Sequence, residues 1–100
     1  MIENLLAVAP AGTRPCFYRT SAGAELDLVL ELPGRERWAV EIKRSTAPTV
    51  GKDFHIACED IGATQQHVVH SGSESFPIAR GVRATTLIDL QQALFALRGP

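Results

Sequence analysis

The sequence has no long hydrophobic run and no excess of charge of either sign. No stretch approaches the ~18 to 20 consecutive apolar residues of a membrane span, and the N-terminus lacks the basic-then-apolar order of a secretion signal. We therefore expect a cytoplasmic protein that does not enter a membrane. Ten basic and eleven acidic residues give a formal net charge of -1, whereas a free-standing nucleic-acid binder usually presents a basic face.

Cysteine is scarce, and the motifs of several large protein classes are missing. Cys16 and Cys58 lie far apart and match no metal-ligand spacing, so we expect both to be reduced. Internal repeats and low-complexity segments are absent. A phosphate-binding loop of the type Gly-x-x-x-x-Gly-Lys-Ser/Thr is absent too, because Gly51 and Lys52 are followed by Asp53 and lack the upstream glycine. This chain therefore carries no ATP-binding module of that kind.

The 100 residues, of which 45% are hydrophobic, suit one compact domain with a single modest core. We expect residues 1–100 to form that domain. A chain of this size has little apolar area to spare, so a neighbouring domain or a second copy in a homodimer could add to its stability.

Hydrophobic periodicity predicts an α/β domain, because helical and strand periods alternate along the chain. Gly81 interrupts the last strand segment, and Thr86 is an N-cap for the last helix, with Asp89 at the capping-box position. The predicted elements are a helix at 2–8, strands at 16–19, 24–32 and 38–42, a helix at 49–61, strands at 66–69 and 78–85, and a helix at 86–97.

Apolar residues gather on one side of each longer element. The strand at 24–32 alternates strictly, which is typical of a strand with one buried face. Its faces carry Leu26, Leu28 and Leu30 on one side and Glu25, Asp27, Val29 and Glu31 on the other. The two longer helices have stripes made of Val50, Phe54, Ala57, Cys58 and Ile61 and of Leu87, Leu90, Leu94 and Leu97.

The two central strands are expected to form a hairpin that brings acidic residues together. A turn centred on Gly34 places Asp27 opposite Glu41 and Glu25 opposite Lys43, on the face away from the leucines. Like charges in directly opposite positions destabilise a sheet by a few tenths to ~1 kcal/mol. A divalent cation such as Mg²⁺, which one or two carboxylates hold, would offset that repulsion. The alternative is a solvated strand face with an ordinary ion pair.

The acidic positions also carry a resemblance to a known family. Glu25-Leu-Asp27 on one strand and Glu41-Ile-Lys43 on the next resemble the motif of the PD-(D/E)xK nucleases. The resemblance implies a restriction-endonuclease-like fold, a mixed central sheet flanked by helices. It also implies that Asp27 and Glu41 hold Mg²⁺ or Mn²⁺ and that Lys43 orients or activates water, with Glu25 as a further ligand. The Pro-Asp of the family motif is replaced here by Glu25-Leu-Asp27.

The resemblance extends along nearly the whole chain. FYRTSAGAELDLVLE followed by AVEIKRS resembles a C-terminal domain of unknown function that stands behind an AAA-type ATP-binding module in many prokaryotic proteins. The opening IENLL resembles the first helix of that family, which implies Glu3 as another member of the acidic cluster. We therefore expect this chain to be the C-terminal piece of a longer ATPase-containing protein.

Two functions follow from the resemblance and stay open at this point. The first is metal-dependent hydrolysis of the phosphodiester bonds of DNA, with Asp27, Glu41 and Lys43 as catalytic residues and Arg19 and Arg44 as phosphate contacts. The second is a non-catalytic domain that binds nucleic acid or assists assembly beside the ATPase. A purely structural dimer module is a third alternative. His67 and His70 make a poor ligand pair, because residues three apart on a strand face opposite sides.

Overall fold

The computed structural model describes residues 2–19, 25–44, 50–79 and 81–98. The expected alternation of helices and strands is present, and the predicted starts at residues 24 and 49 lie outside the described residues. The elements are α1 (Ile2–Val8), β1 (Arg14–Arg19), β2 (Glu25–Leu32), β3 (Glu36–Ile42), α2 (Lys52–Ile61), β4 (Gln65–Val69), β5 (Phe76–Ala79), β6 (Val82–Thr85) and α3 (Leu87–Ala96).

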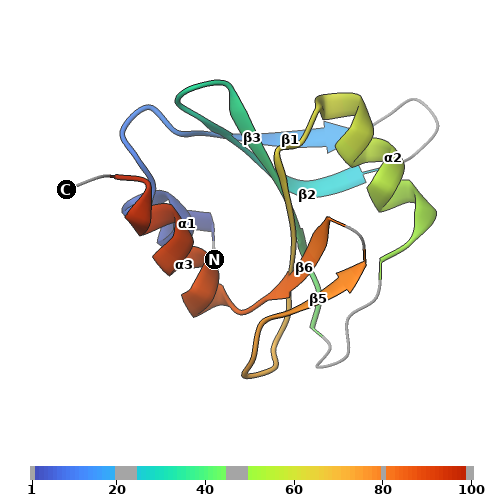
Figure 1. Ribbon diagram of the computed structural model, residues 1–100. Helices are drawn as coiled ribbons and strands as arrows, with labels where there is room; N and C mark the ends of the chain where they lie inside the picture. Colours follow the sequence, from blue (N-terminus) through green and yellow to red (C-terminus); the bar gives the residue numbers. More distant parts are fainter. Residues whose placement is uncertain (1, 20–24, 45–49, 80, 99–100) are drawn as a thin grey trace.

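The strands form one mixed sheet with helices on both faces. Its order is β1-β2-β3-β4-β6-β5, with parallel pairing of β3 with β4 and of β4 with β6 and antiparallel pairing elsewhere. Figure 1 shows α1 and α3 together on one side of the sheet and α2 on the other. The chain is therefore a mixed α/β domain, compatible with the fold class that the sequence predicts. None of the helices in the described ranges is long and apolar enough to cross a membrane.

The hairpin of β2 and β3 has the register that the sequence predicts. Its ladder runs from Leu28 opposite Val40 to Leu32 opposite Glu36, which centres the turn on Gly34. Gly34 has a φ of +84°, a left-handed conformation that glycine adopts at little cost. The next pair in this register would be the two carboxylates of the acidic cluster.

A β-bulge in β2 overturns part of the predicted face pattern. Cys16 on β1 lies opposite Val29, but Tyr18 lies opposite Leu26, so β2 fits one more residue than β1 into this interval. An extra residue reverses the side to which the following side chains point. Leu26 consequently packs with Val29 in one core cluster, whereas Leu28 packs in the other. The prediction that Leu26 shares the face of Leu28 is therefore wrong.

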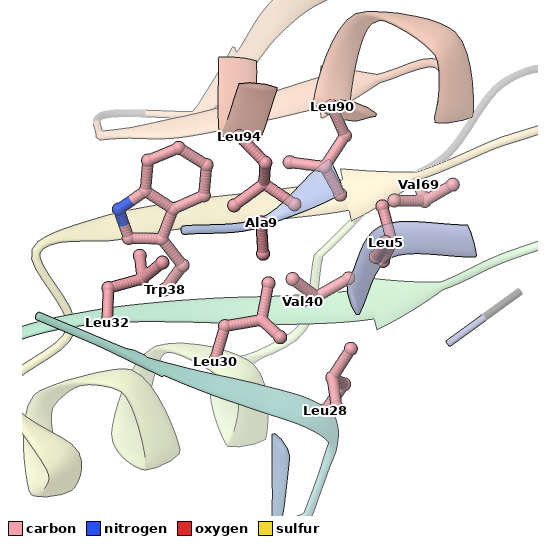
Figure 2. Close-up of a cluster of buried hydrophobic side chains, with 10 residues drawn as sticks. All are labelled: Leu5, Ala9, Leu28, Leu30, Leu32, Trp38, Val40, Val69, Leu90 and Leu94. Atoms are coloured by element: carbon pink, nitrogen blue, oxygen red, sulfur yellow. The ribbon is translucent and has the colours of Figure 1, made fainter. Parts of the chain in front are cut away.

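The first core cluster fills the space between the sheet and the pair α1 and α3. Figure 2 shows leucines from α3 pointing at the apolar side chains of β2 and β3. Trp38 is buried among them, as a packing residue at the start of a strand should be. The cluster consists of Leu5, Ala9, Leu28, Leu30, Leu32, Trp38, Val40, Val69, Leu90 and Leu94.

The second core cluster lies between the sheet and α2, on the face that the alternation of β2 had marked as polar. Burial on both faces is normal for a sheet with parallel strands, since the crossover helix covers the second face. The predicted stripe of α2 enters this cluster. Its members are Leu26, Val29, Ala39, Phe54, Ala57, Cys58, Ile61, Val68 and Val82.

The C-terminal part confirms the predicted helix cap and corrects one core residue. Thr86 Oγ1 accepts a hydrogen bond from Asp89 N–H, so Thr86 is the N-cap of α3. The Asp89 carboxylate does not return to Thr86, because Ser75 lies between them, accepting from Thr86 N–H and donating to Asp89. Leu97, predicted at the core edge, is exposed at the C-cap. Gly81, at a φ of +77°, splits the strand predicted at 78–85 into the hairpin β5–β6.

Truncation of a buried leucine of α3 should destabilise the domain strongly. Leu90 is 0% exposed within the first cluster, so Leu90→Ala should cost ~2–5 kcal/mol of unfolding free energy. The melting temperature should fall by at least ~8 °C, since a domain of this size loses ~4–8 °C per kcal/mol. Ile88→Ala is the control, because Ile88 is 65% exposed on the same helix and should change stability by less than ~0.5 kcal/mol. Equal effects of the two substitutions would contradict this packing.

Candidate metal centre

The acidic cluster lies at the edge of the sheet where two parallel strands end. Ile42 at the end of β3 pairs with Val69 at the end of β4, and Lys43 N–H donates to Val69 O at an N···O distance of 2.8 Å. The antiparallel strand β2 begins at this same edge. Ligands of open α/β sheets commonly bind outside the carboxyl ends of parallel strands, so this edge is a natural position for a site.

Asp27 is fixed by a hydrogen bond to the backbone of the neighbouring strand. Ile42 N–H donates to Asp27 Oδ2 at 2.8 Å. The regular ladder ends at Leu28 and Val40, next to the bulge, so the carboxylate takes the place of a backbone carbonyl there. Bulges often redirect a side chain beside a functional site. One carboxylate oxygen is thereby committed to the fold, and among the described residues Oδ1 has no hydrogen bond of this kind.

Glu41 is the member of the cluster whose carboxyl has a raised pKa. Burial raises the pKa of its carboxyl, Lys43 partly opposes that rise, and the charge of Asp27 adds to it. Burial also raises the pKa of the Cys58 thiol to about 12, with a contribution from the Glu41 charge. Because Cys58 belongs to α2, Glu41 faces the α2 side of the sheet. The two carboxylates and the lysine that the sequence singled out therefore interact in the folded chain.

Lys43 is exposed, as Asp27 is, whereas Glu41 is partly buried. Lys43 Nζ lies 3.7 Å from Glu41 Oε1, and the Lys43 side chain is 42% exposed against 21% for Glu41. An exposed pair of this kind adds little stability. The ammonium can therefore turn towards an incoming anion without a large loss of folding free energy.

The other predicted site residues are placed less closely. Glu3 lies in the first turn of α1, which packs on the opposite face of the sheet from α2. Arg19 and Glu25 pair through their backbones at the end of β1 and β2, but the structure does not describe their side chains. Arg44 follows Lys43 and is exposed. The two ring nitrogens of His67 bond to the side chains of Thr85 and Gln65.

The donor set suits a hard cation that keeps most of its water. Among the described residues, no group of three or more histidine, cysteine, aspartate or glutamate side chains could hold a metal ion. Mg²⁺ does not need such a cage, because it binds through one or two carboxylates and fills its other positions with water and substrate phosphate. Asp27 and Glu41 offer two carboxylates, and Asp27 Oδ1 takes no part in the hydrogen bond from Ile42 N–H. The pair fits Mg²⁺ or Mn²⁺ better than a structural zinc ion, which requires four ligands.

A second polar cluster, which the sequence did not reveal, lies at the other end of β2. Cys16 Sγ donates to Glu31 Oε1 at 2.8 Å, and this hydrogen bond lowers the pKa of Glu31 while it raises that of Cys16. Arg37 Nη1 donates to Ile61 O at 2.9 Å. These residues line a hollow of about 170 Å³ between β1 and α2. No local pattern marks this cluster, because its members come from three strands and a helix.

The fold and the site together define a mixed α/β domain with two interacting carboxylates and a lysine at the carboxyl edge of its sheet. A family model described as "Domain of unknown function (DUF4143)" matches residues 1–90, so the chain belongs to that family.

Two mycobacterial proteins are similar to this chain. They are Uncharacterized protein Rv2008c of Mycobacterium tuberculosis and Uncharacterized protein Mb2031c of Mycobacterium bovis, each 36% identical over 86 residues. The alignment covers 84% of this chain but 19% of either relative, so the chain spans about a fifth of their length. No solved structure matches the chain significantly.

Neutralising Glu41 should stabilise the metal-free protein at neutral pH. A carboxyl whose folded pKa is raised favours its protonated form, so wild-type stability declines as the pH rises through that pKa. Glu41→Gln removes this ionisation and should unfold at a higher denaturant concentration than wild type at pH 8. The difference should shrink as the pH falls to 4, below the ordinary glutamate pKa of 4.5, because Glu41 becomes increasingly protonated in both folded and unfolded chains. Chemical denaturation between pH 4 and 8 measures this.

The control for this experiment is Glu36→Gln, which removes one negative charge at the far end of the same strand. An equal gain from both substitutions would mean that net charge, rather than the buried position of Glu41, limits stability.

Proposed function

We propose that this chain is a metal-dependent, nuclease-like domain that acts on the phosphodiester bonds of DNA. The observation that carries the proposal is the interaction of Asp27, Glu41 and Lys43 at the end of β3. The resemblance of these positions to the PD-(D/E)xK motif assigns each of them a role. Membership of the family is compatible with the proposal and neither adds to it nor restricts it.

Each of these three residues has its own role in the proposed phosphodiester hydrolysis. Asp27 and Glu41 would hold Mg²⁺ or Mn²⁺, and the ion would supply Lewis acidity and a bound water of lowered pKa. The bond from Ile42 N–H to Asp27 keeps that carboxylate in position before the ion arrives. Lys43, whose Nζ lies 3.7 Å from Glu41 Oε1, would orient water or stabilise charge that develops on the phosphate.

The remaining predicted residues have supporting roles in this proposal. Arg44, exposed beside Lys43, and Arg19, at the same edge on β1, would contact phosphates on either side of the scissile one. Glu25, two residues before Asp27 at the start of β2, would bind the ion or a water molecule that the ion holds. Glu3 would bind the metal ion only if α1 reached around the edge of the sheet.

A non-catalytic role is the second candidate, and one observation favours it. In the described residues the cluster has two carboxylates, and Glu41 already has Lys43 as a counter-ion. A domain that only binds DNA or docks against an AAA-type ATPase module in a longer chain would need no ion. A cytoplasmic location and a homodimer are expected under either proposal.

Magnesium-dependent cleavage by purified protein tests the catalytic proposal. Supercoiled plasmid should be nicked with Mg²⁺ or Mn²⁺ and remain intact with EDTA. Asp27→Asn should lower the rate at least ~100-fold, the usual effect of losing one preorganised group. The asparagine amide oxygen can still accept from Ile42 N–H, so the fold should survive. Lys43→Ala should have a similar effect, and Glu36→Gln, at the other end of β3, is the control that should cleave normally.

The contrary outcomes separate the two candidates. Cleavage that persists in both Asp27→Asn and Lys43→Ala would come from a contaminant and end the catalytic proposal. Absence of cleavage combined with salt-dependent DNA binding would favour the non-catalytic domain.

A further inference from the structure

The loop between β4 and β5 forms a hollow beside the candidate metal centre. The hollow has a volume of about 310 Å³, at the lower end of the range for small-molecule sites. It begins where β4 ends, and β4 is the neighbour of the strand that carries Glu41 and Lys43. The residues that line it are His70, Gly72, Ser73, Glu74 and Phe76.

A buried histidine in this hollow has one ring nitrogen without a partner. His70 is 6% exposed, and its Nδ1 accepts a hydrogen bond from Gly72 N–H at 2.9 Å. Within the described part of the chain, Nε2 is buried and has no hydrogen-bond partner. Buried polar atoms of this kind are uncommon in folded proteins. Two others occur, on Trp38 and Gln66, but neither residue lines this hollow.

The hydrogen bond from Gly72 decides what His70 can bind. Since Nδ1 accepts, the neutral ring must carry its proton on Nε2, which is then a donor. A metal ion at Nε2 would require the proton on Nδ1, and Gly72 N–H occupies that position. The missing partner of His70 is therefore a hydrogen-bond acceptor and not a cation.

The loop that forms the hollow is held at both ends. His70 N–H donates to Thr85 O at 3.2 Å, which attaches the start of the loop to β6. Near the other end, Ser75 Oγ accepts from Thr86 N–H at 3.1 Å. The ends of the loop are therefore fixed, whereas His70 Nε2 is buried without a ligand, so a ligand that reaches it has to move the residues between these ends.

We propose that this hollow binds an unpaired nucleobase of the nucleic acid on which the domain acts. A base offers a flat face, a carbonyl or ring nitrogen that accepts, and N–H groups that donate. The exposed Phe76 ring provides a stacking surface, with its centroid 5.4 Å from that of His70. His70 Nε2–H provides the donor, and the Glu74 carboxylate provides the acceptor. A phosphate in this position would instead meet the negative charge of Glu74.

The position of the hollow links the base to the candidate metal centre, so this inference rests on the proposed function. Adjacent strands lie ~4.7–4.9 Å apart, and His70 follows directly on the residue that accepts from Lys43 N–H. A base in the hollow and a phosphate at Asp27 and Glu41 therefore belong to the same nucleotide or to neighbours. The domain would accordingly prefer single-stranded or locally unpaired substrate.

Binding to labelled oligonucleotides in EDTA tests the inference without any cleavage. Wild type should bind a single-stranded 12-mer ~10-fold more tightly than a 12-mer of abasic sites, since stacking of one base has about that effect. Glu74→Gln and His70→Phe should each reduce the ratio of the affinity for the 12-mer with bases to the affinity for the abasic strand, because loss of a negative charge alone affects both strands equally. Glu59→Gln, an exposed position on α2, is the matched control for loss of charge. Equal affinities of wild type for the two strands would overturn the inference.

A spectroscopic measurement keeps the test decisive if His70→Phe does not fold. Two-dimensional NMR of the histidine rings should show the Nε2–H tautomer for His70, and titration with GMP should shift the Gly72 amide. The Nδ1–H tautomer, or an unmoved Gly72 amide at saturating GMP, would overturn the inference. A chain that prefers bases but never cleaves would contradict the catalytic proposal alone.

Discussion

The hydrogen bond from Ile42 N–H to the Asp27 carboxylate joins the fold of this domain to its candidate site. A bulge in β2 interrupts the regular ladder next to Ile42, which is only partly buried. Asp27 satisfies the N–H of Ile42 with its side chain. The same bulge turns Leu26 into the core beneath α2. One local irregularity therefore both positions a carboxylate at the edge of the sheet and completes the second core cluster.

The electrostatics of this edge depend on α2. The helix partly buries Glu41, and the pKa of that carboxyl is raised although Lys43 lies 3.7 Å away. A partly buried carboxylate next to a second, exposed one is poorly compensated by one lysine and well compensated by a divalent ion. This imbalance is the physical basis of the proposed metal dependence. It is also the reason why the pKa of Glu41 is raised in the metal-free fold.

The candidate metal centre and the hollow around His70 share one origin in the topology of the sheet. Strands β3, β4 and β6 are parallel, so their carboxyl ends and the loops that follow them meet at one edge. The aligned part makes up 19% of each of the two mycobacterial relatives. The strand ends and loops at this edge carry the polar groups from which both proposed binding sites are built.

Sequence alone determined the kinds of element, the hairpin register and the helix cap, because each depends on residues close together in the chain. Gly34 fixed the turn, and Thr86 fixed the start of α3. The tertiary structure decided which faces are buried, because periodicity cannot report a bulge that arises from pairing with β1 or a second helix layer over Val29. It also decided the role of His70, whose donor nitrogen is defined only by the fold of the loop around it.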